Sequence, residues 1–292
     1  MEKNAFHSLL QLRSAAFNTE HIGQYALCFK LHGSIIEAVA FHVGDKMLVY
    51  YERFGFSKFL PIQEVWQQLV AEHAFLGAGY WQQIAILEPE LGYVQVPIEL
   101  FSTDLPHDLL NLHLSLNTEK AAISFWQHPA FNLVNVFAFN KEIASLVAGL
   151  YPLSTLRHAH VSDAILLGLH SMPEKLDYRY LHLFVNRNHL TIAFFRTGNL
   201  HLLNSYQFDT PEDLLYYVLF ALTELGLEKD RTELLLWGDV GATFAGRLSI
   251  LQQYFPLLSF GGRPKGIQYH YQFDELDNHV AFDLLAAYYL FV

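Results

Sequence analysis

The sequence is poor in cysteine and in basic residues. Of its 292 residues, one is cysteine, 18 are lysine or arginine, and 29 are aspartate or glutamate. A single cysteine, Cys28, excludes an intrachain disulfide and any metal site built on several thiolates. Cys28 lies within the apolar run 25–29, which favours an inert thiol in the core over a reactive nucleophile.

The sequence also lacks long apolar runs and an excess of positive charge. Its formal net charge is −11, which argues against nucleic acid as a partner because phosphate binding depends on lysine and arginine. No apolar run approaches the roughly 20 residues of a membrane-spanning helix. The N-terminus lacks the basic start and continuous apolar stretch of a signal peptide. We therefore expect a soluble, cytoplasmic protein without a membrane span.

Apolar and aromatic residues are abundant. Hydrophobic residues make up 52% of the chain and aromatic residues 15%, whereas charged residues make up only 16%, against about 25% in typical soluble proteins. Such a chain can bury a large core, so intrinsic disorder is excluded. At ~150 residues per domain, the length predicts about two domains or one large one.

An internal repeat organises the sequence. Landmark residues recur at offsets of 149 to 154 positions, at a turn, a helix start, a helix end and a strand. The pairs are Gly44 and Gly198, Pro61 and Pro211, Gly77 and Gly226, and Leu87 and Trp237. The alternative is two unrelated α/β segments with ordinary turn residues. The constant offset favours a duplicated module.

Each copy predicts a three-stranded antiparallel meander, then a helix, then a strand. Pro211 suits the first helical turn, and Thr210 with Asp213 suits a capping interaction. The strand-like runs are 25–32, 34–43 and 46–54 in the first copy, and 180–187, 189–196 and 200–208 in the second.

Further α/β pattern follows each copy. The remaining helix-like runs are 108–116, 140–150, 161–170 and 278–290, and a turn and helix are expected over 238–255. The remaining strand-like runs are 120–126, 131–139, 154–160 and 256–260. The polar, proline-containing break at 171–177 predicts the domain boundary. We expect a first domain over 1–172, with an inserted segment at about 89–130, and a second over 173–292.

A β-β-β-α-β-α-β-α module that occurs twice resembles the actin-like ATPase superfamily. This superfamily includes actin, Hsp70, the sugar kinases, and bacterial actin homologues of pilus assembly and cell division. More narrowly, the sequence resembles a bacterial family of uncharacterised proteins with that fold. The resemblance covers about residues 25–292. It implies two ribonuclease-H-like α/β domains, each with a mixed five-stranded sheet, and a nucleotide between them in the active members.

The first phosphate loop of that superfamily has the pattern Asp-x-Gly-x-x-Ser/Thr, in which the aspartate orients hydrated Mg²⁺. The matching stretch here is 31–36. Gly33 is retained and is followed by Ser34. Leu31 stands where the aspartate is expected, and Ile36 stands where the hydroxyl is expected. Apolar side chains can neither hold Mg²⁺ nor donate to a phosphate.

The second phosphate loop would match residues 186–191. Asn186 replaces the aspartate, Asn188 replaces the glycine, and Thr191 fits the pattern. The glycines that pack against adenosine would match the stretch after the last long strand. Gly238 and Gly241 are present there, with Asp239 in place of a glycine. A strand-Gly-x-x-Gly-helix turn is common in α/β proteins, so a tight connection is the alternative interpretation.

These replacements favour a non-catalytic actin-like protein that acts as a protein-binding or assembly module. Losing both loop aspartates removes metal positioning from phosphoryl transfer, so we expect neither enzyme activity nor a cofactor. The alternative is a divergent ATP-binding protein or kinase that uses ATP and Mg²⁺ through substituted residues. The protein partner is not identified by the sequence.

Other polar groups carry weaker signals. His158 and His160, with Asp163, have a spacing that can serve a metal, but two ordinary polar positions on a half-buried strand are the favoured interpretation. His42, His182 and His201 alternate with apolar residues and are predicted on solvent faces of strands. The Gly/Pro-rich run 261–266 is expected to be a surface loop. The aromatic run 268–273 is expected to form a strand, either packed on a sheet or exposed at its edge for a partner.

Overall fold

The structure is a computed structural model, and it describes residues 5–89, 92–112, 114, 117, 119–238 and 245–292. The chain packs into two compact units that are not continuous in sequence. The first unit contains the N-terminal part up to Leu167, together with Gly266–Glu275 and Leu284–Val292. The second contains Gly168–Lys265 and Leu276–Asp283.

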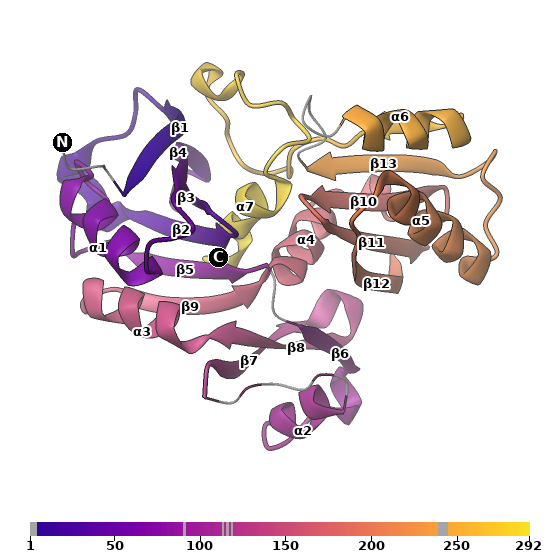
Figure 1. Ribbon diagram of the computed structural model, residues 1–292, viewed down its shortest axis with the longest axis horizontal. Helices are drawn as coiled ribbons and strands as arrows, with labels where there is room; N and C mark the ends of the chain where they lie inside the picture. Colours follow the sequence, from indigo (N-terminus) through magenta and orange to yellow (C-terminus); the bar gives the residue numbers. More distant parts are fainter. Residues whose placement is uncertain (1–4, 90–91, 113, 115–116, 118, 239–244) are drawn as a thin grey trace. The chain divides into compact units, whose positions relative to one another are not determined.

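The first unit is built on a six-stranded mixed sheet (Figure 1). Strands β2, β3 and β4 form an antiparallel meander, whereas β5 and β9 run parallel to β2. The strands lie in the order β1 (Phe6–Arg13), β4 (Met47–Phe56), β3 (Ile35–His42), β2 (Tyr25–His32), β5 (Gln83–Glu88) and β9 (Thr155–His160).

Two helices cover one face of this sheet. Helices α1 (Ile62–Glu72) and α3 (Lys141–Leu150) bury one apolar stripe each against the alternating inward residues of the strands. On the other face, the Phe41 ring packs against the rings of Tyr288 and Phe291 from the last turn of the chain. The first unit also contains the short helices η1 (Thr19–Gln24), η6 (Tyr271–Phe273) and η7 (Ala287–Leu290).

Strand β1 is the sixth strand of this sheet, beyond the five that the resemblance implies. It pairs antiparallel with β4 at the edge of the sheet, and most of its side chains are exposed. Backbone hydrogen bonds rather than apolar burial therefore hold β1, which explains why its sequence shows no clear strand pattern.

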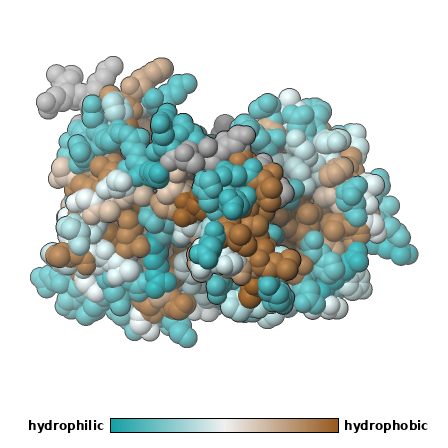
Figure 2. Space-filling view, turned by 90° about the horizontal axis from the view of Figure 1, so that it is seen from below, coloured by the Kyte–Doolittle hydropathy of each residue, from teal (hydrophilic) through white to brown (hydrophobic). Residues whose placement is uncertain are grey.

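A small separate sheet lies between β5 and β9 in the sequence. It has the order β6 (Tyr93–Pro97), β8 (Leu133–Asn140) and β7 (Ala121–His128), and α2 (Pro106–Asn111) packs on it. Its connections include η2 (Ile98–Leu100) and η3 (Pro129–Phe131). Figure 2 views the molecule from the side on which α2 lies in Figure 1, and apolar side chains are visible among polar ones. Exposed leucines near α2 are Leu100, Leu105 and Leu112.

The second unit repeats the arrangement of the larger sheet. Its strands lie in the order β12 (Asn199–Gln207), β11 (His189–Arg196), β10 (Tyr180–Asn186), β13 (Glu233–Gly238) and β14 (Leu258–Phe260). The first three are antiparallel and the last two run parallel to β10, as in the first unit. Its helices are η4 (Pro173–Lys175), α5 (Pro211–Leu225) and α6 (Ala245–Tyr254).

The two sheets confirm the predicted α/β class, with two sheet-containing domains that each hold a three-stranded meander. Helix α4 (Val161–His170) connects the units, and α7 (Phe282–Ala286) returns the chain to the first. The helix expected over 278–290 is shorter, because α7 changes to the η7 turn after Ala286.

Two predictions about individual segments are wrong. The run 268–273 forms no strand, since it makes one isolated bridge, between Gln268 and Met47, and then turns at η6. His182 does not face solvent, because the rings of Phe195 and Trp237 cover it completely. By contrast, His201 is exposed and His42 is half-buried.

Candidate functional site

The first candidate loop is the tight turn between β2 and β3. His32 pairs with Ile35, so only Gly33 and Ser34 connect the strands. Gly33 has a φ of +58°, which glycine adopts without strain, and the Ser34 carbonyl accepts a hydrogen bond from the Phe56 N–H at 3.0 Å. A two-residue turn offers the N–H groups of two residues at most, which is a small cradle for a phosphate.

The replaced positions of this loop point into the core. Ile36 is fully buried in the apolar core of the first unit, and Leu31 packs against the same core. Because side chains alternate along a strand, these two positions lie on the α1 face of the sheet. An aspartate at position 31 would therefore face apolar side chains.

The second candidate loop is the matching turn between β10 and β11. Asn186 pairs with His189, so Arg187 and Asn188 form the connection, with Arg187 at a φ of +51°. The Arg187 carbonyl accepts a hydrogen bond from the Arg247 guanidinium, and the Asn188 carbonyl accepts one from the Phe208 N–H at 2.8 Å. Two hydrogen bonds to its backbone carbonyls thus hold this turn in place.

Thr191 lies further along β11, away from this turn. Its hydroxyl is 2.8 Å from the hydroxyl of Ser205 on β12. This contact is a cross-strand pair of the kind that stabilises sheets. The hydroxyl that fits the superfamily pattern is therefore engaged within the sheet.

Gly238 ends β13 beside the second loop, since it pairs with Val185, the neighbour of Asn186. Its φ is +100°, and a Cβ there would lie 1.8 Å from the Val185 carbonyl oxygen, so only glycine fits. The Gly238 N–H donates to the His279 carbonyl at 2.8 Å. Asp239 and Gly241 lie outside the described residues. The second unit thus brings Asn186, Asn188 and Gly238 to one end of its sheet, as Gly33 and Ser34 lie in the first.

A buried charged cluster lies on β2, β3 and β4, and sequence reasoning missed it. Glu37 is 1% exposed and pairs with Lys30, which is 4% exposed, at 2.9 Å. The Glu37 carboxylate also contacts the His32 ring at 3.1 Å, the Tyr51 hydroxyl at 2.7 Å and the Arg53 guanidinium at 3.2 Å. The available signal was one lysine and one glutamate inside otherwise apolar strands.

The electrostatics of this cluster fix the charge of Glu37. Burial alone would raise its pKa, but the charge of Lys30, with contributions from His32 and Arg53, holds the pKa well below its usual range. For Tyr51, burial followed by the neighbouring Glu37 charge raises the pKa. Glu37 is therefore an ionised carboxylate near neutral pH, held by the neighbouring cations.

The three residues weighed as metal ligands do not converge. The His158 ring stacks on Phe139 at 4.2 Å, and burial lowers its pKa. His160 contacts the Ser162 hydroxyl at 2.7 Å. Asp163 accepts from the His160 backbone N–H at 2.8 Å and contacts His128 at 2.8 Å. Within the part of the chain that the structure describes, no group of three or more histidine, cysteine, aspartate or glutamate residues could hold a metal.

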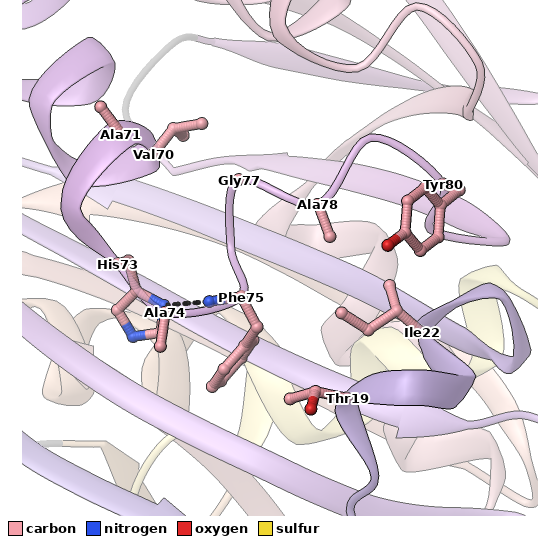
Figure 3. Close-up of a pocket in the computed structure, with 10 residues that line it drawn as sticks. All are labelled: Thr19, Ile22, Val70, Ala71, His73, Ala74, Phe75, Gly77, Ala78 and Tyr80. Carbon is pink, nitrogen blue, oxygen red and sulfur yellow. Dashed lines mark hydrogen bonds between the residues drawn. The ribbon is translucent and has the colours of Figure 1, made fainter.

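The first unit also contains a pocket of about 390 Å³ at the C-terminal end of α1 (Figure 3). It holds no residue of either candidate loop. The His73 ring on its wall is fully engaged, since Nδ1 accepts from the Phe75 and Leu76 N–H groups and Nε2 lies 3.1 Å from Glu52. The lining residues are Thr19, Ile22, Val70, Ala71, His73, Ala74, Phe75, Gly77, Ala78 and Tyr80.

Across the described ranges, no helix is long and apolar enough to cross a membrane. A family model matches residues 14–258, which is most of the chain, and its description is "Protein of unknown function (DUF3822)". The chain belongs to this family. No curated protein matches the sequence significantly.

Solved structures identify the fold of this family member. A Bacteroides thetaiotaomicron protein with an actin-like ATPase fold and unknown function matches with a TM-score of 0.76 and 18% identity, covering 94% of this chain and 99% of that one. The PilM–PilN type IV pilus biogenesis complex contains a chain that matches with a TM-score of 0.59 and 13% identity, covering 90% of this chain and 97% of that one. The protein therefore has the actin-like ATPase fold.

Proposed function

We propose that this protein is a non-catalytic actin-like protein that binds other proteins and acts in their assembly. In this proposal its two units descend from a duplicated domain, and its two hairpin loops are degenerate nucleotide-binding loops. It works in the cytoplasm, without ATP, Mg²⁺ or another cofactor.

The observation that carries the proposal is the placement of Leu31 and Ile36. Ile36 belongs to the apolar core of the first unit and Leu31 packs against it, where an ATPase of this fold would need a hydroxyl and a carboxylate. Loss of metal positioning costs several kcal/mol of transition-state stabilisation, and each ~1.4 kcal/mol is tenfold in rate. ATP turnover at a useful rate is therefore not expected.

Two further observations support the proposal. Gly238 matches a glycine that packs against adenosine in the superfamily. Its N–H donates a hydrogen bond to the His279 carbonyl instead. In addition, one matching structure is a complex of two proteins in pilus biogenesis, so a chain with this fold works there within a protein assembly.

The test combines nucleotide binding and turnover on the full-length protein. We expect no change in melting temperature with ATP or ADP and Mg²⁺ at millimolar concentration. A nucleotide at 100 times its dissociation constant would add about 2.7 kcal/mol of stability. We also expect phosphate release no faster than that of a heat-inactivated sample.

Variants separate the protein's own activity from contamination. Asn186→Ala alters the second loop, and Asn204→Ala alters an exposed position on β12 as a matched control. Turnover that disappears in Asn186→Ala but persists in Asn204→Ala would overturn the proposal in favour of a divergent ATPase. Turnover that is equal in both variants and in the inactivated sample supports it.

A further inference from the structure

The outer face of α5 carries a row of exposed aromatic rings. Tyr216 is 61% exposed and Phe220 is 43% exposed, and their rings stack with centroids 6.2 Å apart. Tyr217 meets Tyr216 edge to face at 5.4 Å and stacks on Tyr206 of the edge strand β12 at 4.6 Å. We call these four residues the α5 aromatic row.

The core of the second unit does not need Tyr216 and Phe220. The opposite face of α5 is buried against the sheet and supplies its core contacts through Leu214, Leu215, Val218, Ala221 and Leu222. Aromatic side chains that stay this exposed gain less from folding than buried ones do. Their position on the solvent side points to contact with another molecule.

Helix α1 provides an internal comparison. It follows the three-stranded meander of the first unit, as α5 follows that of the second, and it buries Val65, Trp66 and Leu69. Its exposed positions are polar or small, namely Glu64, Gln67, Ala71 and Glu72. The fold therefore accepts a polar outer face at this position, and the aromatic row is particular to α5.

The charges around the row indicate the chemistry of its partner. Glu212, Tyr216, Phe220 and Glu224 follow one another at four-residue spacing, so the rings lie between two exposed carboxylates on one helix face. Helix α5 contains no lysine, arginine or histidine. Arg196 donates to the Leu225 carbonyl at the helix end. A second copy of this chain would bring carboxylates against carboxylates, whereas a basic segment is complementary.

We propose that the α5 aromatic row docks a segment of a partner protein in which apolar or aromatic side chains lie between lysine or arginine residues. The proposal rests on the proposed protein-binding function and adds to it the surface and the kind of partner. The rings supply the buried anchors of such an interface, and Glu212 and Glu224 supply its charged rim.

The test uses a random library of linear peptides displayed on phage and selected on the full-length protein. We expect enriched peptides to carry aromatic or aliphatic residues flanked by lysine or arginine. Synthetic copies, measured by fluorescence anisotropy, should lose at least about tenfold in affinity to Tyr216→Ser/Phe220→Ser. They should bind unchanged to Gln67→Ser/Ala71→Ser, the matched control on α1, and more weakly as salt rises.

Three results of the peptide experiment would overturn the proposal. These are the absence of enrichment, equal affinity for the protein and its Tyr216→Ser/Phe220→Ser variant, and enrichment of acidic peptides. A dimer in sedimentation that dissociates in the same variant would assign the surface to a second copy and also overturn it. All four substituted positions are exposed, so we expect thermal melts of both variants to match that of the unaltered protein.

ATP turnover on the same preparations keeps the two proposals distinguishable. Turnover with specific peptide binding would remove the non-catalytic function but leave the docking surface intact. If the peptides bind the Tyr216→Ser/Phe220→Ser variant as tightly as the unaltered protein, and no ATP turnover is found, only the docking surface is overturned.

Discussion

Buried polar residues in this protein derive their properties from the strands on either side of them. Lys30 and Glu37 are directly opposite in the β2–β3 register, and Arg53 is opposite Glu37 in the β3–β4 register. Two cations therefore share one carboxylate in a place almost closed to water. Removing one partner of such a buried pair leaves an uncompensated charge, which costs more than the pair itself contributes.

Substitution of Glu37 should consequently be severe. We expect Glu37→Gln to lower the free energy of unfolding by about 3–5 kcal/mol, because the buried pair between Lys30 and Glu37 is then broken. The double variant Lys30→Met/Glu37→Leu removes both charges and should recover most of the loss. Urea unfolding of the three proteins measures this, and a double variant as unstable as the single one would contradict the expectation.

His182 predicts a pH dependence of stability. Burial lowers its pKa from 6.5 to about 3, although its Nε2 lies 3.0 Å from the Lys175 carbonyl. Below pH 6.5 the unfolded chain binds a proton that the folded protein does not. Stability should therefore fall as pH falls toward 3, by up to about 1.4 kcal/mol per pH unit for this one group.

The variant His182→Phe removes that titration. Its free energy of unfolding should decline less steeply between pH 6.5 and 4 than that of the unaltered protein. His201→Phe, at an exposed histidine of the same unit, should keep the original slope. If the slopes of His182→Phe and the unaltered protein coincide, His182 does not remain neutral in the fold.

At the scale of single elements, local sequence signals were most successful. Thr210 and Asp213 form the expected capping interaction at the start of α5, in which each side chain accepts from the other residue's backbone N–H. Gly226 ends the helix with a φ of +65°. These features involve residues within a few positions of one another, so the sequence displays them directly.

The cap of α5 can be tested without disturbing its aromatic row. We expect Thr210→Ala to lower the free energy of unfolding by about 1 kcal/mol, because the Asp213 N–H loses its acceptor. Thr223→Ala, at an exposed position in the last turns of the same helix, should change it by less than about 0.5 kcal/mol. Equal effects in urea unfolding would show that the loss at Thr210 is not specific to the cap.

At the scale of the whole molecule, the end of the chain packs with the first unit, although it follows the second repeat in the sequence. The sequence predicts domains over 1–172 and 173–292, yet Leu284–Val292 packs with the first unit. Tyr288 and Phe291 contact the Phe41 ring there, and Arg157 donates to the Leu290 carbonyl at 2.7 Å. A fragment that ends at the predicted boundary lacks this cover.

We therefore expect the fragment 1–172 to bind an apolar dye and to melt without a sharp transition. Exposing Phe41 and losing its two covering rings forfeits about 1.5–3 kcal/mol for each buried side chain. Co-expression of residues 266–292 should restore a cooperative melt. A fragment 1–172 that melts cooperatively by itself would instead support the domain boundary drawn from the sequence.

The sequence alone was enough to predict the two meanders, the helix and strand that follow each of them, the capped start of α5 and the replacement of the loop aspartates, but not strand β1. These are local patterns of periodicity and turn chemistry, which a linear chain displays. Four features depend on the tertiary fold. Ile36 lies in the core with Leu31 packed against it, Lys30 meets Glu37, His182 is enclosed, and the His279 carbonyl accepts from the Gly238 N–H. Each of these depends on which distant residues a fold brings together, and hydrogen bonding and burial at such contacts are not written in any short stretch of sequence.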